Sequence, residues 1–181
     1  MQIRLAEPDR DAAVVAAIYR PSVEQGLASF EEVAPEEGAM AARMRATLER
    51  YPWLVADDGG TVVGYAYAGA HAERAGYRWS VNISAYVDVA FHGRGIGRAL
   101  YDELLPILRR QRFVNAYAGI ALPNSASVAL HQAIGMRRIG VYDRVGFKLD
   151  AWHSVAWYGL RLADPEDRPP EPIPLPELDP T

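Results

Sequence analysis

The feature that most constrains the fold of this chain is a glycine-rich turn between a strand-like and a helix-like segment. Residues 86–105 read YVDVAFHGRGIGRALYDELL, with glycines at 93, 95 and 97. A strand that enters a helix through such a turn leaves backbone N–H groups free where the helix dipole favours an anion. Arg94 and Arg98 add positive charge, so the sequence predicts a site for a pyrophosphate. The alternative is a tight connection whose glycines merely permit positive φ.

Two common phosphate-binding motifs do not fit this turn. A Walker loop has four residues between its first glycine and a Gly-Lys-Ser/Thr end, but GRGIGRAL has neither that spacing nor a lysine. The dinucleotide fingerprint needs a third glycine three residues after the second, where this chain has Arg98 or Leu100. The turn is therefore neither a P-loop nor a Rossmann fingerprint.

The segments around the turn predict a mixed α/β domain. Strands are expected over residues 3–6, in a hairpin over 52–70 that turns at Asp58-Gly59, over 78–89 and 113–122, and in two final stretches before Leu162. Helices are expected over residues 8–24, from Pro35 onward, after the glycine turn, and over 124–135. The first helix has Asp9 available as N-cap, and Pro21 ends or bends it. The helix after the glycine turn is expected to kink at Pro106. A strand–helix–strand unit therefore lies at the centre of the chain.

Composition limits the possible classes of protein. The chain has 181 residues, half of them hydrophobic, which suits one buried core. Its formal net charge of -4 argues against a general nucleic-acid binder. It has no cysteine, which excludes a disulfide framework and a thiolate nucleophile, and we predict no metal site. The charged start and the lack of a long apolar run predict a soluble, cytoplasmic protein without membrane association.

The predicted domain covers residues 1–162. Residues 163–181 are rich in proline and acidic residues and have too little apolar surface to form a core. They predict a flexible or extended tail. A polyproline segment that binds a partner is the alternative.

The segment HGRGIG resembles the acetyl-CoA motif Q/R-x-x-G-x-G/A of the GNAT N-acetyltransferases, with His92 where Gln or Arg is usual. The segments RYPWLVA, YAYAG, YRW, GIALPNSASVALHQAIGM and VGFKLDAWHSVAW are similar, in order, to the branch that acetylates phosphinothricin, methionine sulfoximine and arsinothricin. The resemblance covers roughly residues 3–162. It implies the α/β GNAT acyl-CoA N-acyltransferase fold, with a mixed, splayed central sheet flanked by helices.

The same resemblance implies an activity and its partners. Acetyl-CoA would be the co-substrate, the acceptor would be the α-amine of a small amino acid, and the protein would be a homodimer with a role in herbicide or antibiotic resistance. Direct transfer fits best, because no cysteine is present to carry an acetyl group.

The resemblance also implies a cofactor site. The strands containing ISAYVDV and FVNAYAGIAL would part to admit the pantetheine arm, and backbone amides of the glycine turn would hold the pyrophosphate. Asn124 is either a further cofactor contact or an ordinary N-cap, and the two roles are compatible. The implied cofactor residues are Ala85, Tyr86, Val87, Val89, Gly93, Arg94, Gly95, Ile96, Gly97, Arg98 and Asn124.

The implied catalytic residues depart from the family pattern. The family carries a glutamate as the usual general base, but RWSVN puts Asn82 in that place. An amide cannot accept the proton, although it can hold a water or the incoming amine. Glu31 and Asp88 are the other candidate acids, unless they are merely solvated. His131 stands where many GNAT enzymes have a tyrosine and could donate to the departing thiolate, unless it serves packing.

By family position, Phe30 would form a wall of the amino-acid pocket. Arg74 and Tyr77 would approach the carboxylate and acidic head group of the substrate, which the planar fork of arginine suits. Lys148 and Trp152 lie on a segment that the family uses near the pocket and the dimer interface. A surface role for Arg74 and a core role for Trp152 are the alternatives.

Three other functions stay open. The first is an enzyme of the same fold for a different amine, such as another amino acid, a polyamine or an antibiotic. The second is a non-catalytic acyl-CoA sensor that kept the cofactor site and lost its base. Asn82 keeps both open. The third is another kind of nucleotide-binding module.

Overall fold

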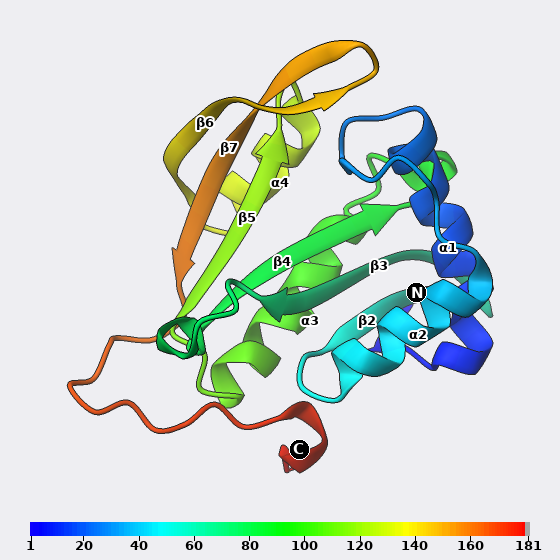
Figure 1. Cartoon of the computed structure of the whole chain (residues 1–181). Coiled ribbons are helices and arrows are strands. Elements are labelled where there is room, and N and C mark those ends of the chain that lie inside the picture. The colour runs from blue at the N-terminus through cyan, green and yellow to red at the C-terminus, as the bar shows by residue number, and fades with distance from the viewer. Residues whose placement is uncertain (180–181) are drawn as a thin grey trace.

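Seven strands form one open sheet in the computed structural model, which describes residues 1–179 (Figure 1). The sheet order is β1-β2-β3-β4-β5-β7-β6. The strands are β1 (Gln2–Leu5), β2 (Trp53–Asp58), β3 (Thr61–Ala70), β4 (Ser80–Val87), β5 (Asn115–Ala121), β6 (Arg137–Lys148) and β7 (Ala151–Arg161). The helices are α1 (Pro8–Glu24), α2 (Glu37–Leu48), α3 (Ile96–Arg110) and α4 (Ser125–Ala133), with short 3-10 turns η1 (Ala75–Tyr77), η2 (Val89–Phe91) and η3 (Leu175–Glu177).

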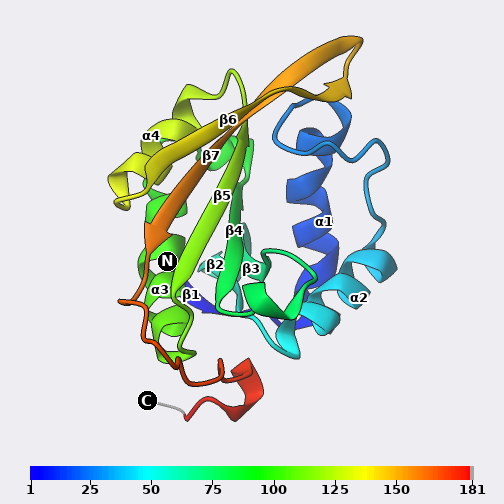
Figure 2. The same cartoon turned by 60° about the vertical axis from the view of Figure 1, so that its left-hand side comes forward.

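The sheet consists of two antiparallel halves joined by one parallel pair. Strands β1 to β4 form the first half, and β5, β7 and β6 form the second. The parallel pairing of β4 with β5 extends over Ser80–Asn82 and Asn115–Tyr117 only. Beyond these residues the two strands part (Figures 1 and 2). The predicted mixed, splayed GNAT sheet is confirmed.

Each face of the sheet carries its own core. On one face, α3 buries Leu100, Leu104 and Leu108 completely, and α4 packs beside it. On the other face, α1 and α2 bury residues such as Val15 and Met44 against β2 and β3. These buried side chains recur at the three- and four-residue spacing that places them on one side of a helix. Burial of this apolar surface fixes the helices on the sheet.

Two prolines lie inside helices. Helix α1 continues past Pro21 to Glu24, so Pro21 does not end it, and α3 continues through Pro106 to Arg110. The predicted bend at Pro21 and kink at Pro106 stay predictions. Pro106 lies on the exposed side of α3, where water can bond the carbonyl that loses its helical partner. The predicted N-cap of α1 is wrong. Glu7 is the N-cap residue and Pro8 begins the helix, a position that the fixed φ of proline suits.

The tail after β7 follows an extended course against the domain (Figure 1). The Trp79 Nε1 donates to the Pro170 carbonyl at 2.8 Å, and the Arg78 guanidinium makes two 2.7 Å bonds to Glu171. The buried Gln111 amide donates to the Ile173 carbonyl at 2.8 Å. The described residues of the tail thus follow an extended course, and its flexibility stays a prediction.

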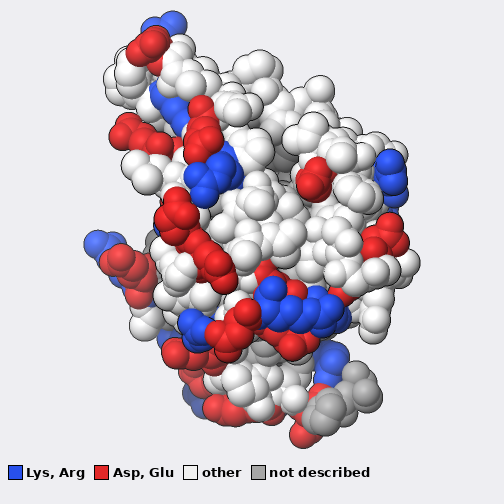
Figure 3. Space-filling model, turned by 90° about the vertical axis from the view of Figure 1, so that its right-hand side faces the viewer, with Lys and Arg blue, Asp and Glu red and all other residues white. Residues whose placement is uncertain are grey.

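Charge is mixed on the surface that carries α1 and α2. Figure 3 shows acidic and basic side chains interspersed there around an uncharged centre. Several of these charges are paired, as Arg20 is with Glu24 and Arg45 is with Asp9. No helix within residues 1–179 is both long enough and apolar enough to cross a membrane.

Substitution of Asp11 will destabilise the fold strongly. Its side chain is 1% exposed and accepts two bonds from Arg4, at 2.7 and 2.8 Å, and one from the Glu7 N–H. The substitution leaves the Glu7 N–H without its acceptor and leaves Arg4 with the longer 3.3 Å bonds to Asp57. Asp11→Ala should therefore lose about 3 kcal/mol of unfolding free energy in chemical denaturation. Asp9→Ala, which breaks an exposed pair with Arg45, is the control and should lose less than about 1 kcal/mol.

The same carboxyl makes stability depend on pH. Burial raises the pKa of Asp11, but the bonds from Arg4 and Glu7 outweigh it, so the net pKa lies below the ordinary value. The stabilisation is therefore complete above the unfolded pKa of about 4 and is lost as the pH falls through the folded value. Equal losses of unfolding free energy in Asp11→Ala and Asp9→Ala at neutral pH would contradict this role of Asp11.

Candidate active site

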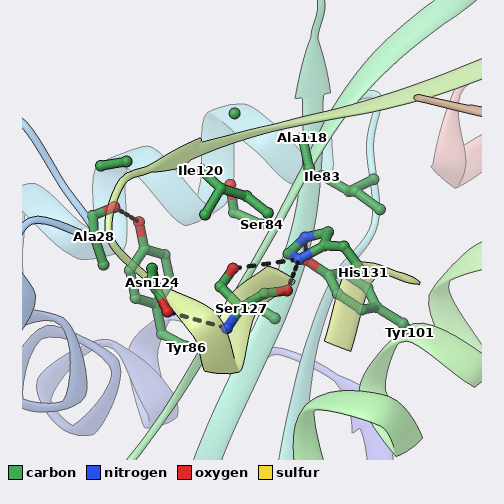
Figure 4. A pocket seen from close by; sticks show the side chains of 13 residues that line it. Ala28, Ile83, Ser84, Tyr86, Tyr101, Ala118, Ile120, Asn124, Ser127 and His131 are labelled. Atoms are coloured by element: carbon green, nitrogen blue, oxygen red, sulfur yellow. Dashed lines mark hydrogen bonds between the residues drawn. The ribbon is translucent and has the colours of Figure 1, made fainter. Parts of the chain in front are cut away.

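A pocket opens where β4 and β5 part (Figure 4). Its walls come from both strands, its floor from α3 and α4, and one edge from the loop after α1. The lining residues are Ala28, Ile83, Ser84, Ala85, Tyr86, Tyr101, Ala118, Gly119, Ile120, Ala121, Asn124, Ser127 and His131. Of the residues predicted from the sequence, the pocket brings together Ala85, Tyr86, Asn124 and His131.

The open edge of β4 presents free backbone groups to this pocket. The Asp88 N–H donates to the Val63 carbonyl of β3. In an antiparallel pair the backbone groups alternate between the two sides, so Tyr86 also bonds β3, while Ala85 and Val87 face the side where β5 has departed. The Val87 carbonyl accepts a 2.9 Å bond from His92 Nε2. The side chain of Tyr86 contributes differently, because its hydroxyl donates to the Ala28 carbonyl at 3.4 Å.

The glycine turn lies at the start of α3, as predicted. Gly93 and Gly95 have φ of 75° and 77°, which favours glycine. The first bond of α3 runs from the Ala99 N–H to the Gly95 carbonyl, so the N–H groups of residues 96–98 have no partner within the helix. A Cβ at Gly97 would lie 2.9 Å from Leu130 Cδ2, so this glycine permits α3 to pack closely on α4.

The two arginines of the turn differ in their surroundings. Arg94 is exposed and stacks on Phe91 with 4.8 Å between guanidinium carbon and ring centre. Arg98 bonds Asp102 at 2.7 Å and the Ala133 carbonyl at 3.0 Å, so its side-chain charge is offset. Val89, in η2, is largely exposed. Any part that Arg98 plays in an anion site would come from its backbone N–H.

His131 lies buried at the floor of the pocket in one defined tautomer (Figure 4). Its Nδ1 is 2.7 Å from the Ser127 carbonyl, which can only accept, so Nδ1 carries the proton. Its Nε2 therefore accepts from the Tyr101 hydroxyl at 3.1 Å. Burial lowers the pKa of His131 more than the Ser127 bond raises it, and burial raises the pKa of Tyr101. The ring is thus neutral at pH 7.

Sequence reasoning missed Tyr101 and Ser127. Ser127 precedes His131 by four residues on one helix, a spacing that places both on one face and was visible in the sequence. The contact with Tyr101 depends on how α3 packs against α4, and no local pattern indicates it.

Asn82 lies on β4 two residues before Ser84, on the same face of the strand. Its side-chain oxygen is 2.9 Å from Nδ1 of His71, which follows the last residue of β3. The His71 ring also lies 4.5 Å from the Tyr117 ring and 6.0 Å from the Tyr77 ring, between centres. The sequence analysis missed His71, although the hairpin register that pairs Ala70 with Val81 brings it here.

The two candidate acids are engaged with other groups. Glu31 accepts two bonds from Arg43, at 2.8 and 2.9 Å, and one from the Tyr19 hydroxyl. The Arg43 guanidinium holds the pKa of Glu31 below its usual range. Asp88 caps η2 through a 2.8 Å bond from the Ala90 N–H. Glu31 is therefore stabilised in its charged form, and Asp88 is engaged in capping a 3-10 turn.

The predicted substrate residues fall in two places. Phe30 packs so closely over Gly146 of β6 that a Cβ there would lie 2.5 Å from its ring, and the buried Lys148 donates to the Ser29 carbonyl at 2.6 Å. These contacts fasten the loop after α1 to the β6–β7 hairpin. Trp152 is 61% exposed and contacts Phe147, outside the pocket. Arg74 and Tyr77 lie exposed at η1, where Tyr77 is near His71.

Residues 3–157 match the acetyltransferase (GNAT) domain family. The chain belongs to this family. It is therefore an acetyl-CoA-dependent N-acetyltransferase. Within residues 1–179 no group of acidic, histidine or cysteine side chains could hold a metal ion.

Curated relatives and solved structures agree with this assignment. A phosphinothricin N-acetyltransferase of Streptomyces viridochromogenes is 35% identical, over 90% of this chain and 88% of its own. An L-methionine sulfoximine/L-methionine sulfone acetyltransferase of Salmonella typhimurium is 32% identical over 90% of this chain and 95% of its own length. The solved phosphinothricin acetyltransferase from Sinorhizobium meliloti, in complex with acetyl-CoA, has a TM-score of 0.86 and 35% identity over 93% of this chain and 94% of its own.

Replacement of Gly95 by alanine will weaken acetyl-CoA binding. The substitution forces a Cβ into positive φ and shifts the N–H groups that begin α3. The expected result is about a tenfold rise in the Kd for acetyl-CoA, measured by titration calorimetry, which corresponds to about 1.4 kcal/mol.

Gly59→Ala is the matched control, because Gly59 has φ of 65° in the β2–β3 turn and, like Gly95, no atom near an added Cβ. Both variants should lose about 1 kcal/mol of stability, and only the first should lose affinity. Unchanged affinity in Gly95→Ala would show that the turn does not hold the cofactor.

Proposed function

We propose that this N-acetyltransferase moves the acetyl group of acetyl-CoA directly to the α-amine of a small amino acid of the phosphinothricin, methionine sulfoximine or arsinothricin type. Such a reaction would give resistance to a toxic amino acid. The observation that carries the proposal is the pocket between the parted β4 and β5, which is lined by the open edge of β4 and by Tyr101, Asn124 and His131. The glycine turn begins α3, the helix that supplies Tyr101, and Asn82 directly precedes the β4 residues of the pocket. The similarity to phosphinothricin and methionine sulfoximine acetyltransferases supports the substrate class.

The cofactor side of the site follows from the open edge of β4. Backbone groups of Ala85 and Val87 bond the pantetheine arm in place of a neighbouring strand, and the N–H groups at the start of α3 hold the pyrophosphate. Acetyl-CoA supplies the thioester that the amine attacks. Asn124, whose side chain caps α4 through the Ser127 N–H, lies beside the arm. The chain has no cysteine, so no thiol can carry the acetyl group.

The departing thiolate is stabilised from the floor of the pocket. His131 is the proposed residue, and it acts indirectly, because its Nδ1–H bonds the Ser127 carbonyl and its Nε2 accepts from the Tyr101 hydroxyl. The Ser127 hydroxyl, 3.3 Å from Nδ1, is the donor that this arrangement leaves for the sulfur. It is held in place before the reaction, so it needs little reorganisation when negative charge develops on sulfur. A neutral imidazole at this position avoids a buried cation next to apolar strand residues.

The amino-acid substrate occupies the face that carries Asn82. Tyr77 and Tyr117 offer aromatic walls there, and Arg74 at the rim is the proposed partner of a carboxylate. Phe30 and Lys148 act indirectly, because they fasten the loop after α1 that closes one edge of the pocket. Glu31 orders the same loop through Arg43.

An enzyme for a different amine is the second candidate, and the observation that favours it is Asn82 at the usual glutamate position. A non-catalytic acyl-CoA sensor is a weaker alternative. The expectation that the protein acts in the cytoplasm stays a prediction.

We further propose a homodimer formed through β6. This edge strand, the turn after it and the start of β7 carry a strip of largely exposed apolar side chains: Ile139, Val141, Tyr142, Val145, Phe147, Leu149 and Trp152. An unpaired edge with a row of apolar residues favours association with another chain. A second copy fits, because the family resemblance implies one.

Sedimentation equilibrium should therefore give twice the 20.0 kDa chain mass. Ile139→Glu should shift the protein to monomer, because it places a charge on the strip. Val33→Glu is the control, since Val33 is 81% exposed in the loop between α1 and α2. A wild-type monomer, or an equal effect of the two variants, would refute the interface.

The substrate class is tested by release of free CoA thiol from acetyl-CoA. The panel holds phosphinothricin, methionine sulfoximine, arsinothricin and the ordinary amino acids. Because the chain has no cysteine, the enzyme adds no thiol of its own to the signal. Saturable release is expected with at least one of the three toxic amino acids. Acetyl-CoA binding without release for any of them would reject the assigned substrate class and favour another amine.

A further inference from the structure

We infer that His71, oriented by Asn82, is the catalytic residue that accepts the proton of the incoming amine. The inference rests on the proposed function, because it concerns the proton acceptor of that reaction. It answers the difficulty that an amide stands where the family carries a glutamate. A histidine supplied by the neighbouring strand end takes over the task, and the asparagine becomes its positioning residue.

The hydrogen bonds around Asn82 define the tautomer of His71. The Asn82 Nδ2 donates to the Ala70 carbonyl at 3.4 Å, which directs Oδ1 toward His71. That oxygen can only accept, so the 2.9 Å contact requires a proton on Nδ1 of the imidazole. The neutral ring then has its lone pair on Nε2. Within residues 1–179, this nitrogen has no hydrogen-bond partner.

The position of His71 suits a proton acceptor for an amine in this pocket. Asn82 is the last β4 residue that pairs with β5, opposite Tyr117, and the pocket begins at the next residues of both strands. Asn82 and Ser84 are separated by roughly 7 Å along the strand. The His71 ring rests against Tyr117, so it lies beside the end of the pocket from which an amine would approach the thioester.

The surroundings of His71 are aromatic rather than charged. The rings of Tyr77, Tyr117 and Trp157 lie within 6.2 Å of its own, between centres. By contrast, Glu31 is fixed by Arg43 and Tyr19, and Asp88 is used as a cap. Among the acceptors considered, His71 alone combines a free lone pair with a place on the substrate face.

The step balances as follows. The neutral amine nitrogen forms a bond to the thioester carbonyl carbon, the C–S bond breaks, and the thiolate of CoA leaves with the electron pair. Nε2 of His71 takes one proton from the nitrogen and becomes part of an imidazolium, whose second N–H keeps its bond to Asn82. The imidazolium then releases the proton to solvent. Asn82 stays neutral throughout and holds the ring.

His71→Gln should lower kcat about 100-fold or more, whereas the KM for the amine and the Kd for acetyl-CoA should change by less than about twofold. His153→Gln is the matched control, since His153 is also half-buried and bonded through one nitrogen, to the Lys148 carbonyl. It should keep kcat within about twofold. His71→Gly should regain activity when imidazole is added to the buffer, which a purely structural residue would not show.

Variants of Asn82 separate orientation from proton transfer. Asn82→Asp keeps the acceptor for Nδ1–H and should therefore lower kcat less than Asn82→Leu, which should lower it about tenfold. In the double variant His71→Gln/Asn82→Glu, the carboxylate should restore part of the lost rate. If His71→Gln keeps most of the wild-type kcat, the inference is wrong.

A readout without turnover separates this inference from the substrate assignment. In the ¹⁵N spectrum of the ligand-free protein, His71 should show a protonated Nδ1 and an unprotonated Nε2, and Asn82→Leu should mix the two tautomers. If no amino acid of the panel is acetylated but this tautomer is found, only the substrate class fails. A protonated Nε2 in the neutral ring overturns the role of His71 whatever the substrate.

Discussion

Three residues of parallel pairing between β4 and β5 join the two halves of the sheet, and the site depends on how early that pairing stops. Ser80–Asn82 pair with Asn115–Tyr117, and the Trp79 carbonyl accepts from the N–H groups of residues 114 and 115 just before them. The backbone groups that β4 would have given to β5 become available to a ligand. Since unsatisfied backbone groups at a buried edge are costly, such an edge favours an occupant that can bond like a strand.

The same parting explains the chemistry placed around it. His131 and Tyr101 come from the helices on one face, and His71 and Asn82 come from the other. Each histidine has its tautomer fixed by an oxygen that can only accept a hydrogen bond. A thioester lying between the strands would therefore have the bonded group of Tyr101, His131 and Ser127 beside its sulfur and the free lone pair of His71 beside the incoming amine.

Much of this could be predicted from the sequence, because the relevant signals are local. The glycines at 93 and 95 need positive φ, the apolar spacing of α3 indicates its buried face, and the Asp58-Gly59 turn indicates the β2–β3 hairpin. The family resemblance then predicted that β4 and β5 part. Asn124 as N-cap of α4 is likewise local, and the structure has it.

The rest depended on contacts between distant segments. The pair of Tyr101 and His131 joins two helices through residues that are thirty positions apart. The offset of the Arg98 charge by Asp102 is the exception, since this pair is four residues apart on one helix and could have been read from the sequence. His71 escaped notice because a lone histidine in a polar turn carries no periodic signal. Pro21 does not end α1, because burial of one face of the helix outweighs the local rule against proline inside a helix.

The anchored tail has a consequence for how the two halves of the sheet are joined. It leaves the end of β7, crosses Arg78 and Trp79 beside the start of the β4–β5 pairing, and reaches the Arg50 carbonyl in the other half through the Leu175 N–H. It thus ties both halves together at the closed end of the cleft (Figure 1). The tail therefore adds hydrogen bonds between the two halves on the side of the β4–β5 pairing that lies away from the pocket. The three paired residues are thus not the sole connection that keeps the two strands at their spacing at that end.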